Sequence, residues 1–295
     1  MELSSIISNV MQIPMAKISC ILVLKNGMTN QSFLFSYENE QYILRIPGVG
    51  TEVLIGRKHE AEVYSLLANK SICDHIIYFD AETGYKISKY YKNARVCDPL
   101  KEDDVRRCMV FLRNFHQKKF YVNHVFDLWE RINYYESLWT EKTIYTDYEF
   151  VKRRVFQLRD YITVDKSEFC LCHIDAVPDN FLFVGNDIHL IDWEYAGMQD
   201  PHVDIAMFGI YSFYNREQMD NLINFYFQGK CADAVRLKIY CYVAICGLLW
   251  SNWCEYKRMR GVEFGEYAFR QYQYAKDYLK IVETEVEKRK MQINE

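Results

Sequence analysis

The chain has 295 residues, enough for a substantial hydrophobic core in one large domain or in two lobes. Half of the residues are hydrophobic and 16% are aromatic, which excludes an intrinsically disordered chain. The net charge is −4 and Lys and Arg are dispersed, so we expect no nucleic-acid partner.

Targeting and cysteine patterns indicate the compartment. Residues 1–18 lack the basic start and apolar run of a secretory signal, and no segment approaches a membrane span. The ten cysteines include no Cys-x2-Cys pair, and Cys170 with Cys172 would not by themselves make a zinc site. We therefore expect a cytoplasmic protein without membrane insertion, with reduced and mostly buried thiols. No pattern indicates an oligomeric state.

The N-terminal part is expected to be rich in strands. A short helix over residues 1–13 ends at Pro14. Apolar runs between turns then predict strands over 18–24, 31–37, 41–46, 76–79 and 85–90. One amphipathic helix over 57–68 is inserted after the third strand, and Glu60 lies on its apolar face. The first three strands therefore form an antiparallel meander.

From about Lys92 onward the pattern becomes helical. Apolar stripes predict helices over 100–118, 127–138, 148–161, 216–228, 232–255 and 265–290. We place a hinge at 90–93, which gives an N-terminal lobe of residues 1–91 and a C-terminal lobe of residues 92–295. The expected class is α+β, with a small antiparallel sheet in the first lobe and mainly helices in the second.

A polar turn at 172–180 and the hairpin that follows it carry the candidate catalytic residues. Strands are predicted over 181–184 and 188–191, around a Gly-Asn-Asp turn. Asp192 ends the second strand, so we expect Asp175, Asn180 and Asp192 around one point. Phosphoryl transfer needs a carboxylate at the attacking hydroxyl, and an amide oxygen with a second carboxylate to hold Mg²⁺. The order His-x-Asp-x4-Asn, then Asp, is close to the kinase catalytic loop.

The same polar side chains could instead serve only as caps within a turn. Two features favour the catalytic interpretation. The residues that flank the turn are apolar strands, and Asp192 follows at the distance that a metal-binding carboxylate requires.

The loop between the first two strands is a candidate phosphate-binding loop. It reads Gly27-Met28-Thr29-Asn30 and lies where kinases cover the phosphates. Its backbone amides, with the side chains of Thr29 and Asn30, could donate hydrogen bonds to phosphate oxygens. Because it contains only one glycine, a simple hairpin turn is an equal alternative.

Arg45 and Glu60 form a candidate ion pair behind that loop. Arg45 lies on the third strand, where kinases place a phosphate-binding lysine, and arginine can bind phosphate bidentately. Glu60 lies on an apolar helix face, where a carboxylate needs a partner. The alternative is that both side chains are solvated. Five strands with one helix after the third also match the small lobe of kinases.

As an ordered set, these segments resemble the choline/ethanolamine kinase family, and the similarity is greatest to the bacterial choline kinases. The matching motifs lie at 27–31, 44–46, 55–60, 172–180 and 190–195. The resemblance extends from about residue 27 to residue 278. It implies the fold shared with aminoglycoside phosphotransferases, and transfer of the ATP γ-phosphate to the hydroxyl of choline with ATP and Mg²⁺ as cofactors, giving phosphocholine.

Carried over by motif, the resemblance implies a role for each matching residue. Asp175 would be the catalytic base, Asn180 and Asp192 would bind magnesium, and His173 would brace the loop. The adenine would lie against the hinge at Lys89, Tyr90 and Tyr91.

The acceptor can also be considered from its chemistry. A quaternary ammonium cannot donate an ordinary hydrogen bond, and proteins hold such a cation with aromatic faces. Trp250 and Trp253 are neighbours on one helix surface, Tyr267 follows, and Tyr195 lies close after Asp192. Aromatic residues at helical spacing are commonly core residues. Their place downstream of a kinase centre favours an acceptor site here.

One position departs from the family pattern. Bacterial choline kinases usually carry an acidic residue a few positions after the segment that corresponds to 204–206, and this chain has Tyr211 there. Cation recognition is then expected from the rings of Tyr211 and Tyr214. Asp204 and His202 are expected to brace the loop after the hairpin.

Three alternatives to choline phosphorylation remain open at this point. Ethanolamine has a primary ammonium that needs several acceptors, whereas this region is rich in aromatic residues. An aminoglycoside or another small amino alcohol calls for an acidic cleft. A ligand-binding pseudokinase is a third alternative, and the presence of Asp175, Asn180 and Asp192 argues against it.

Overall fold

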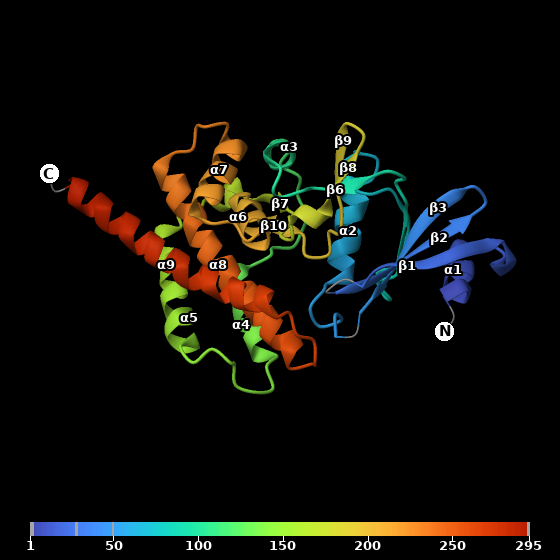
Figure 1. Cartoon of the computed structure of the whole chain (residues 1–295), viewed down its shortest axis with the longest axis horizontal. Coiled ribbons are helices and arrows are strands. Elements are labelled where there is room, and N and C mark those ends of the chain that lie inside the picture. Colours follow the sequence, from blue (N-terminus) through green and yellow to red (C-terminus); the bar gives the residue numbers. More distant parts are fainter. Residues whose placement is uncertain (1–2, 27–28, 49, 294–295) are drawn as a thin grey trace. The chain divides into compact units, whose positions relative to one another are not determined.

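The computed structural model describes residues 3–26, 29–48 and 50–293, which form two compact units (Figure 1). Unit 1 comprises Met1–Cys97 and Asp179–Ala196, and unit 2 comprises Asp98–Pro178 and Gly197–Glu295. The candidate catalytic hairpin thus packs with the N-terminal segment, although it follows much of unit 2 in the sequence. The lobe boundary at 91 and 92 remains a prediction.

Unit 1 contains an antiparallel sheet with the strand order β1-β2-β3-β5-β4. Its strands are β1 (Ile18–Asn26), β2 (Asn30–Tyr37), β3 (Glu40–Pro47), β4 (Ile76–Phe79) and β5 (Lys86–Lys89). The helix α2 (Arg57–Leu67) lies between β3 and β4 in the sequence. The five predicted strands and the inserted helix are therefore confirmed, with ends that differ by one or two residues.

The two faces of this sheet have different chemistry. On one face, α1 (Leu3–Met11) packs Ile6 and Ile7 into a core with Phe35 and Leu44. Side chains alternate along a strand, so Arg45, next to Leu44, points to the opposite face. Arg45 is paired in register with Lys86 on β5. The face away from α1 therefore carries two neighbouring cations.

The hairpin formed by β8 (Phe181–Val184) and β9 (Asp187–Leu190) is joined to unit 1 by backbone hydrogen bonds. The amide of Leu190 donates to the carbonyl of Ile72, and β8 also pairs with β6 (Arg95–Val96). Two residues, Gly185 and Asn186, form the turn, and Gly185 has a φ of 60°. Only glycine adopts that angle at little cost. The predicted hairpin is confirmed, and β6 was not predicted.

Unit 2 is mainly helical (Figure 1). Its helices are α3 (Glu102–Gln117), α4 (Leu128–Ser137), α5 (Tyr148–Gln157), α6 (His202–Tyr211), α7 (Arg216–Phe227), α8 (Asp233–Arg258) and α9 (Glu266–Ile293). The long helix α8 contacts α4, α5, α6 and α9. A short strand β7 (Cys170–Cys172) pairs with β10 (Gly197–Gln199) at the start of the catalytic turn.

Two sequence expectations for unit 2 were wrong. The segment after the hairpin was expected to be a loop, but it begins the helix α6, in which eight of ten residues are buried. A helix that is apolar all round lacks the amphipathic stripe that sequence analysis detects. Second, no segment was expected to approach a membrane span. By length and composition, α8 is long and apolar enough to span a bilayer. Because 83% of its most apolar 18-residue window is buried in the protein, α8 is a core helix.

Candidate active site

A network of buried charges lies at the centre of unit 1. Arg45 contacts Glu60 at 2.5 Å and Asp192 at 2.9 Å, and Arg57 contacts Glu60 at 2.8 Å and Glu194 at 3.0 Å. The side chains of Arg45, Glu60 and Glu194 are at most 4% exposed. The predicted Arg45–Glu60 pair is therefore present, and both side chains are buried rather than solvated. Burial alone would lower the pKa of Arg45, but the surrounding carboxylates raise it well above its ordinary value.

The candidate phosphate loop is joined to this network through Glu194. The hydroxyl of Thr29 donates to Glu194 Oε1 at 2.6 Å, and the amide of Asn30 donates to Glu194 Oε2 at 2.9 Å. Burial, reinforced by the negative charge of Asp192, raises the pKa of Glu194. Gly27 and Met28 lie outside the described residues. Sequence analysis did not assign Glu194 to the site, although its position two residues after Asp192 was a usable signal.

A cavity of about 410 Å³ in unit 1 is lined by several of the predicted nucleotide and metal residues, but its lining does not include Thr29 or Asn30. Its lining includes Arg45, Lys89, Tyr90, Tyr91, Asn180 and Asp192. The cavity is the size of a small-molecule site. Asp74 and Lys86 also line it, and sequence analysis did not assign either of them to the site. Glu60 lies behind the cavity wall, where it holds Arg45.

Asn180 and Asp192 are connected by the hairpin backbone. The amide of Ile191 donates to the carbonyl of Asn180 at 2.9 Å, and both Asn180 and Asp192 line the cavity. Asp192 has a φ of 67°, a left-handed conformation that aspartate adopts more readily than most residues. An amide oxygen and a carboxylate are hard oxygen donors of the kind that Mg²⁺ prefers. These two side chains therefore fit a magnesium ion.

Unit 2 holds the candidate base, Asp175, at the end of a braced loop. Asp204 accepts hydrogen bonds from the backbone amides of His173 at 2.9 Å and Ile174 at 2.8 Å, and it lies 3.0 Å from His116 Nε2. Ile174 has a φ of 68°, which is a strained conformation for a β-branched residue. Asp204 was expected to brace the loop after the hairpin, but it instead braces the loop that precedes Asp175.

An aromatic cluster lies in unit 2, which also holds Asp175. Ring centroids are 5.7 Å apart for Trp250 and Trp253, and 5.8 Å apart for Tyr211 and Tyr267. Phe264, which sequence analysis did not assign to the site, connects the two pairs, because its ring centroid lies 5.1 Å from that of Trp253 and 6.4 Å from that of Tyr267. The pKa of Tyr267 is raised well above its ordinary value by burial, and further by the charges of Cys254 and Asp175. We call these five aromatic residues the aromatic cluster.

The remaining predicted acceptor residues have other surroundings. Tyr214 is buried, and its hydroxyl donates to the carbonyl of Pro99 at 2.5 Å. Its ring lies against Phe208, so it belongs to a different set of contacts from Tyr211. Tyr195 is buried in unit 1, 5% exposed.

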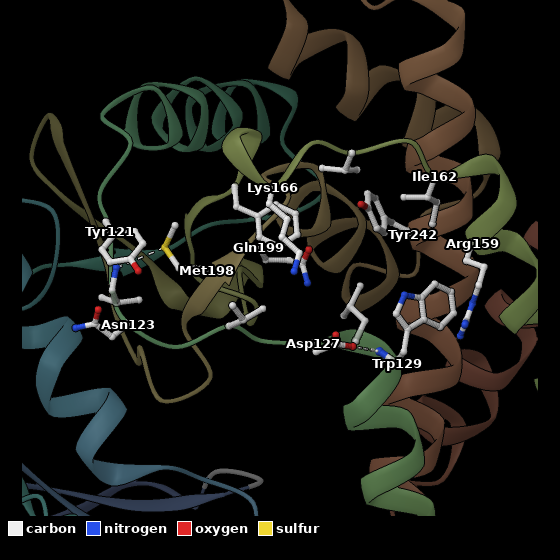
Figure 2. Close-up of a pocket in the computed structure, with 15 residues that line it drawn as sticks. Tyr121, Asn123, Asp127, Trp129, Arg159, Ile162, Lys166, Met198, Gln199 and Tyr242 are labelled. Carbon is white, nitrogen blue, oxygen red and sulfur yellow. Dashed lines mark hydrogen bonds between the residues drawn. The ribbon is translucent and has the colours of Figure 1, made fainter.

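Other polar or hollow features of unit 2 do not involve the predicted site residues. A cavity of about 460 Å³ is lined in part by Trp129, Arg159, Lys166 and Tyr242, whose side chains are labelled in Figure 2. Its wall includes Asp127, whose carboxylate caps α4 by accepting the amides of Trp129 and Glu130. This cavity is separate from the aromatic cluster in its lining.

The thiol pair Cys170 and Cys172 has a third neighbour that the sequence did not predict. The ligand atoms of both thiols and of His116 lie within 4.8 Å of one another. Both ring nitrogens of His116 already have protein partners, the hydroxyl of Tyr226 at 2.9 Å and Asp204 at 3.0 Å. We therefore assign the cluster a packing role.

Comparison with known proteins identifies the family. The sequence profile of choline/ethanolamine kinase matches residues 21–224. Protein LicA of Haemophilus influenzae is 27% identical over 258 residues, which cover 83% of this chain and 75% of that protein. The structure of choline kinase LicA from Streptococcus pneumoniae is 31% identical, with a TM-score of 0.82, and the match covers 94% of this chain and 97% of that one. LicA in complex with AMP gives a TM-score of 0.81 at 30% identity, over 95% and 97% of the two chains.

The fold extends beyond that family. Spectinomycin phosphotransferase APH(9)-Ia matches at 13% identity with a TM-score of 0.55, over 95% of this chain and 96% of that one, and shares the fold alone. The family profile covers more than half of the chain and includes Arg45, Glu60, Asp175, Asn180 and Asp192. The chain therefore belongs to the choline/ethanolamine kinase family and is an ATP-dependent phosphotransferase with the α+β, protein-kinase-like fold.

Proposed function

We propose that this protein transfers the γ-phosphate of ATP to the hydroxyl of choline in the cytoplasm, with Mg²⁺, and so forms phosphocholine. The observation that carries the choice of acceptor is the aromatic cluster, which lies in the same unit as Asp175 and has one member, Tyr267, whose pKa is raised by burial and, in part, by the charge of Asp175. Aromatic faces attract a quaternary ammonium through the ring quadrupole and need no hydrogen bond from it. The pneumococcal relative is itself a choline kinase, which supports the same assignment.

The unit 1 cavity supplies the nucleotide side of the reaction. Its volume of about 410 Å³ suits a nucleotide, and the hinge residues Lys89, Tyr90 and Tyr91 line it with Arg45. Arg45 would bind phosphate oxygens while Glu60 holds its guanidinium in place. Asn180 and Asp192 would hold Mg²⁺, which neutralises charge on the phosphates when bound. Thr29 and Asn30 would donate to phosphate oxygens once released from Glu194.

Unit 2 supplies the acceptor side. Asp175 would orient the choline hydroxyl and accept its proton as the oxygen attacks phosphorus. The rings of Trp250, Trp253, Tyr211 and Tyr267 would surround the ammonium. Trp250 is held by its indole N–H, which donates to the sulfur of Met207 at 2.9 Å. The rings are therefore positioned before the substrate binds, which lowers the entropic cost of recognition. Tyr214 and Tyr195 contribute indirectly, as buried supports of the surrounding chain.

The test is ATP consumption with Mg²⁺ against choline, ethanolamine, mono- and dimethylethanolamine, and an aminoglycoside. We expect kcat/KM to rise with each methyl group added to the nitrogen, with choline highest. A preference for ethanolamine would replace choline by a hydrogen-bonded primary ammonium as acceptor. Turnover of the aminoglycoside alone would keep the kinase and discard the aromatic site. Nucleotide binding without turnover of any acceptor would indicate a pseudokinase.

A further inference from the structure

A buried ion pair lies in the wall of the nucleotide cavity and has no part in the transfer chemistry described above. Lys86 Nζ lies 3.2 Å from Asp74 Oδ2 and donates to the hydroxyl of Tyr64 at 2.6 Å. Asp74 is 6% exposed and Lys86 is 5% exposed. Burying both charges costs more desolvation free energy than an apolar pair of the same volume would. A buried pair at a ligand cavity is therefore better explained by recognition than by stability.

Each member of the pair has hydrogen-bonding capacity left. Among the described residues, Asp74 Oδ1 is buried and has no hydrogen-bond partner. An ammonium has three N–H donors, and Tyr64 and Asp74 accept two of those of Lys86. An unsatisfied buried carboxylate oxygen is costly, so it indicates a partner that binds from outside the protein. The cavity wall thus presents one acceptor and one donor side by side.

This arrangement matches one purine and conflicts with the other. The exposed edge of adenine presents the acceptor N7 next to the donor N6 amino group, whereas guanine presents two acceptors, N7 and O6. We propose that Lys86 donates to N7 of the nucleotide base and that Asp74 accepts from its N6 amino group, so that the pair selects ATP over GTP. This inference rests on the proposed assignment of the unit 1 cavity to the nucleotide.

Neighbouring residues hold Lys86 and Asp74 in position to bind the base. Arg45 and Lys86 are register partners on β3 and β5, so the cation that would bind phosphate and the cation that would bind the base come from adjacent strands. Ser88 lies two residues after Lys86 on the same strand face and also lines the cavity. The Tyr64 hydroxyl fixes the ammonium, because its ring also lies 4.8 Å from Lys86 Nζ. Asp74 also lines a second cavity of about 380 Å³. The experiment therefore tests whether Asp74 Oδ1 serves the nucleotide cavity or this second cavity.

The experiment measures nucleotide affinity by calorimetry on the full chain, without any acceptor alcohol. The probes are the non-hydrolysable analogues of ATP and GTP, together with 7-deaza-ATP, which lacks the N7 acceptor, and N6,N6-dimethyl-ATP, which lacks the N6 donor. We expect the guanine analogue to bind at least about tenfold more weakly than the adenine analogue, and each modified ATP to lose about tenfold, since hydrogen bonds to charged groups have that effect.

Matched variants assign each loss to its residue. In Lys86→Met, 7-deaza-ATP should bind as well as ATP does, and in Asp74→Asn the preference for adenine over guanine should fall about tenfold, because an amide can donate to O6. Lys58→Met is the control, since this exposed lysine of unit 1 pairs with Glu82 at 3.4 Å and does not line the cavity. The double variant Asp74→Leu with Lys86→Met leaves no lone buried charge, and thermal unfolding identifies any variant that fails to fold.

Different results would refute nucleotide binding in the cavity and base recognition by the Lys86–Asp74 pair. Failure of every adenine nucleotide to bind would refute the assignment of the cavity, and with it the proposed function. Equal affinity for the adenine and guanine analogues, or for ATP and 7-deaza-ATP in the unsubstituted protein, would refute base reading alone and leave Asp74 facing the second cavity.

Discussion

The two candidate binding regions solve opposite problems of charge. In unit 1, the buried Arg45 and Lys86 and the half-buried Arg57 pair with carboxylates, so cations are present before any ligand arrives. In unit 2, aromatic rings contact one another, and the candidate base Asp175 belongs to the same unit. Phosphates demand fixed positive charge, whereas a quaternary ammonium is best held by polarisable faces. In the proposed function, each unit thus supplies the chemistry for one substrate.

The two regions should also respond differently to the loss of a side chain. Charges in unit 1 stabilise one another only while the set is complete, because the removal of one leaves its partners buried and uncompensated. Rings in unit 2 contribute through contact area, and removing one of them affects mainly what touches it. Substitutions should therefore affect stability more in unit 1 and acceptor affinity more in unit 2.

The largest effect is expected for Asp175→Ala. Loss of the candidate general base should lower kcat about a thousandfold, with the unfolding temperature nearly unchanged. Steady-state kinetics with saturating ATP and choline measure this. Asp160→Ala, at an exposed aspartate of the same unit, is the control and should retain full activity. Normal turnover of the Asp175 variant would remove this residue from the role of base.

In unit 1, Arg45→Ala should lower the free energy of unfolding by about 3 kcal/mol, as measured in urea. Its removal leaves Glu60, Asp192 and Glu194 without their shared cation. Lys89→Ala removes an exposed cation from the neighbouring strand and should cost less than about 1 kcal/mol. Equal losses in the two variants would contradict the idea that the network acts as a unit.

In unit 2, Trp253→Leu should raise the KM for choline about tenfold and leave the KM for ATP unchanged. The indole ring contacts Trp250 and Phe264, and an isobutyl group cannot replace its quadrupole. Trp129→Leu is a matched control, because Trp129 contacts Phe156 and lines the other cavity of unit 2. An unchanged KM for choline in a folded Trp253 variant would place the ammonium elsewhere.

The smallest effect should appear in the pH dependence of stability. Burial and the charge of Asp192 raise the pKa of Glu194, so its contribution is fully present below the unfolded pKa of about 4.3 and is lost as pH rises through the folded value. Stability of the native chain relative to Glu194→Gln should therefore fall as pH rises above about 4.

A buried carboxylate of unit 2, Asp200, should give stability the opposite dependence on pH. Burial would raise the pKa of Asp200, but the hydrogen bond and charge of His202 and the charge of Lys238 outweigh it and lower the pKa. Its contribution is present above the unfolded pKa of about 3.9 and is lost as pH falls below it. Urea titrations of Asp200→Asn and Glu194→Gln across pH should slope in opposite directions, and parallel slopes would contradict both assignments.

Local patterns allowed much of this structure to be predicted. The place of Arg45 on the third strand, and the apolar helix face that carries Glu60, were enough to predict their ion pair. The turn residues Gly185 and Asn186 allowed the candidate catalytic hairpin to be predicted. The side chains of Asn180 and Asp192, at the end of the hairpin away from this turn, both line the cavity.

Features that depend on distant partners were not predictable. Lys86 and Asp74 each look like ordinary surface residues in the sequence, and only the packing of β5 against the segment before β4 makes them a buried pair. The strands β7 and β10 have three residues each and are separated by more than twenty, so neither carries a periodic signal. The position of Glu194 two residues after Asp192 was a local signal, but its contacts with Thr29 and Asn30 depend on the return of the chain after the hairpin.

The burial of α8 has a consequence for how the chain is made. This helix is apolar enough to attract a membrane or another chain if it stays uncovered. During synthesis its contacts in α4, α5 and α6 precede it, whereas α9 follows it. A nascent chain that has ended before Glu266 therefore exposes one side of α8, and α9 later covers that side.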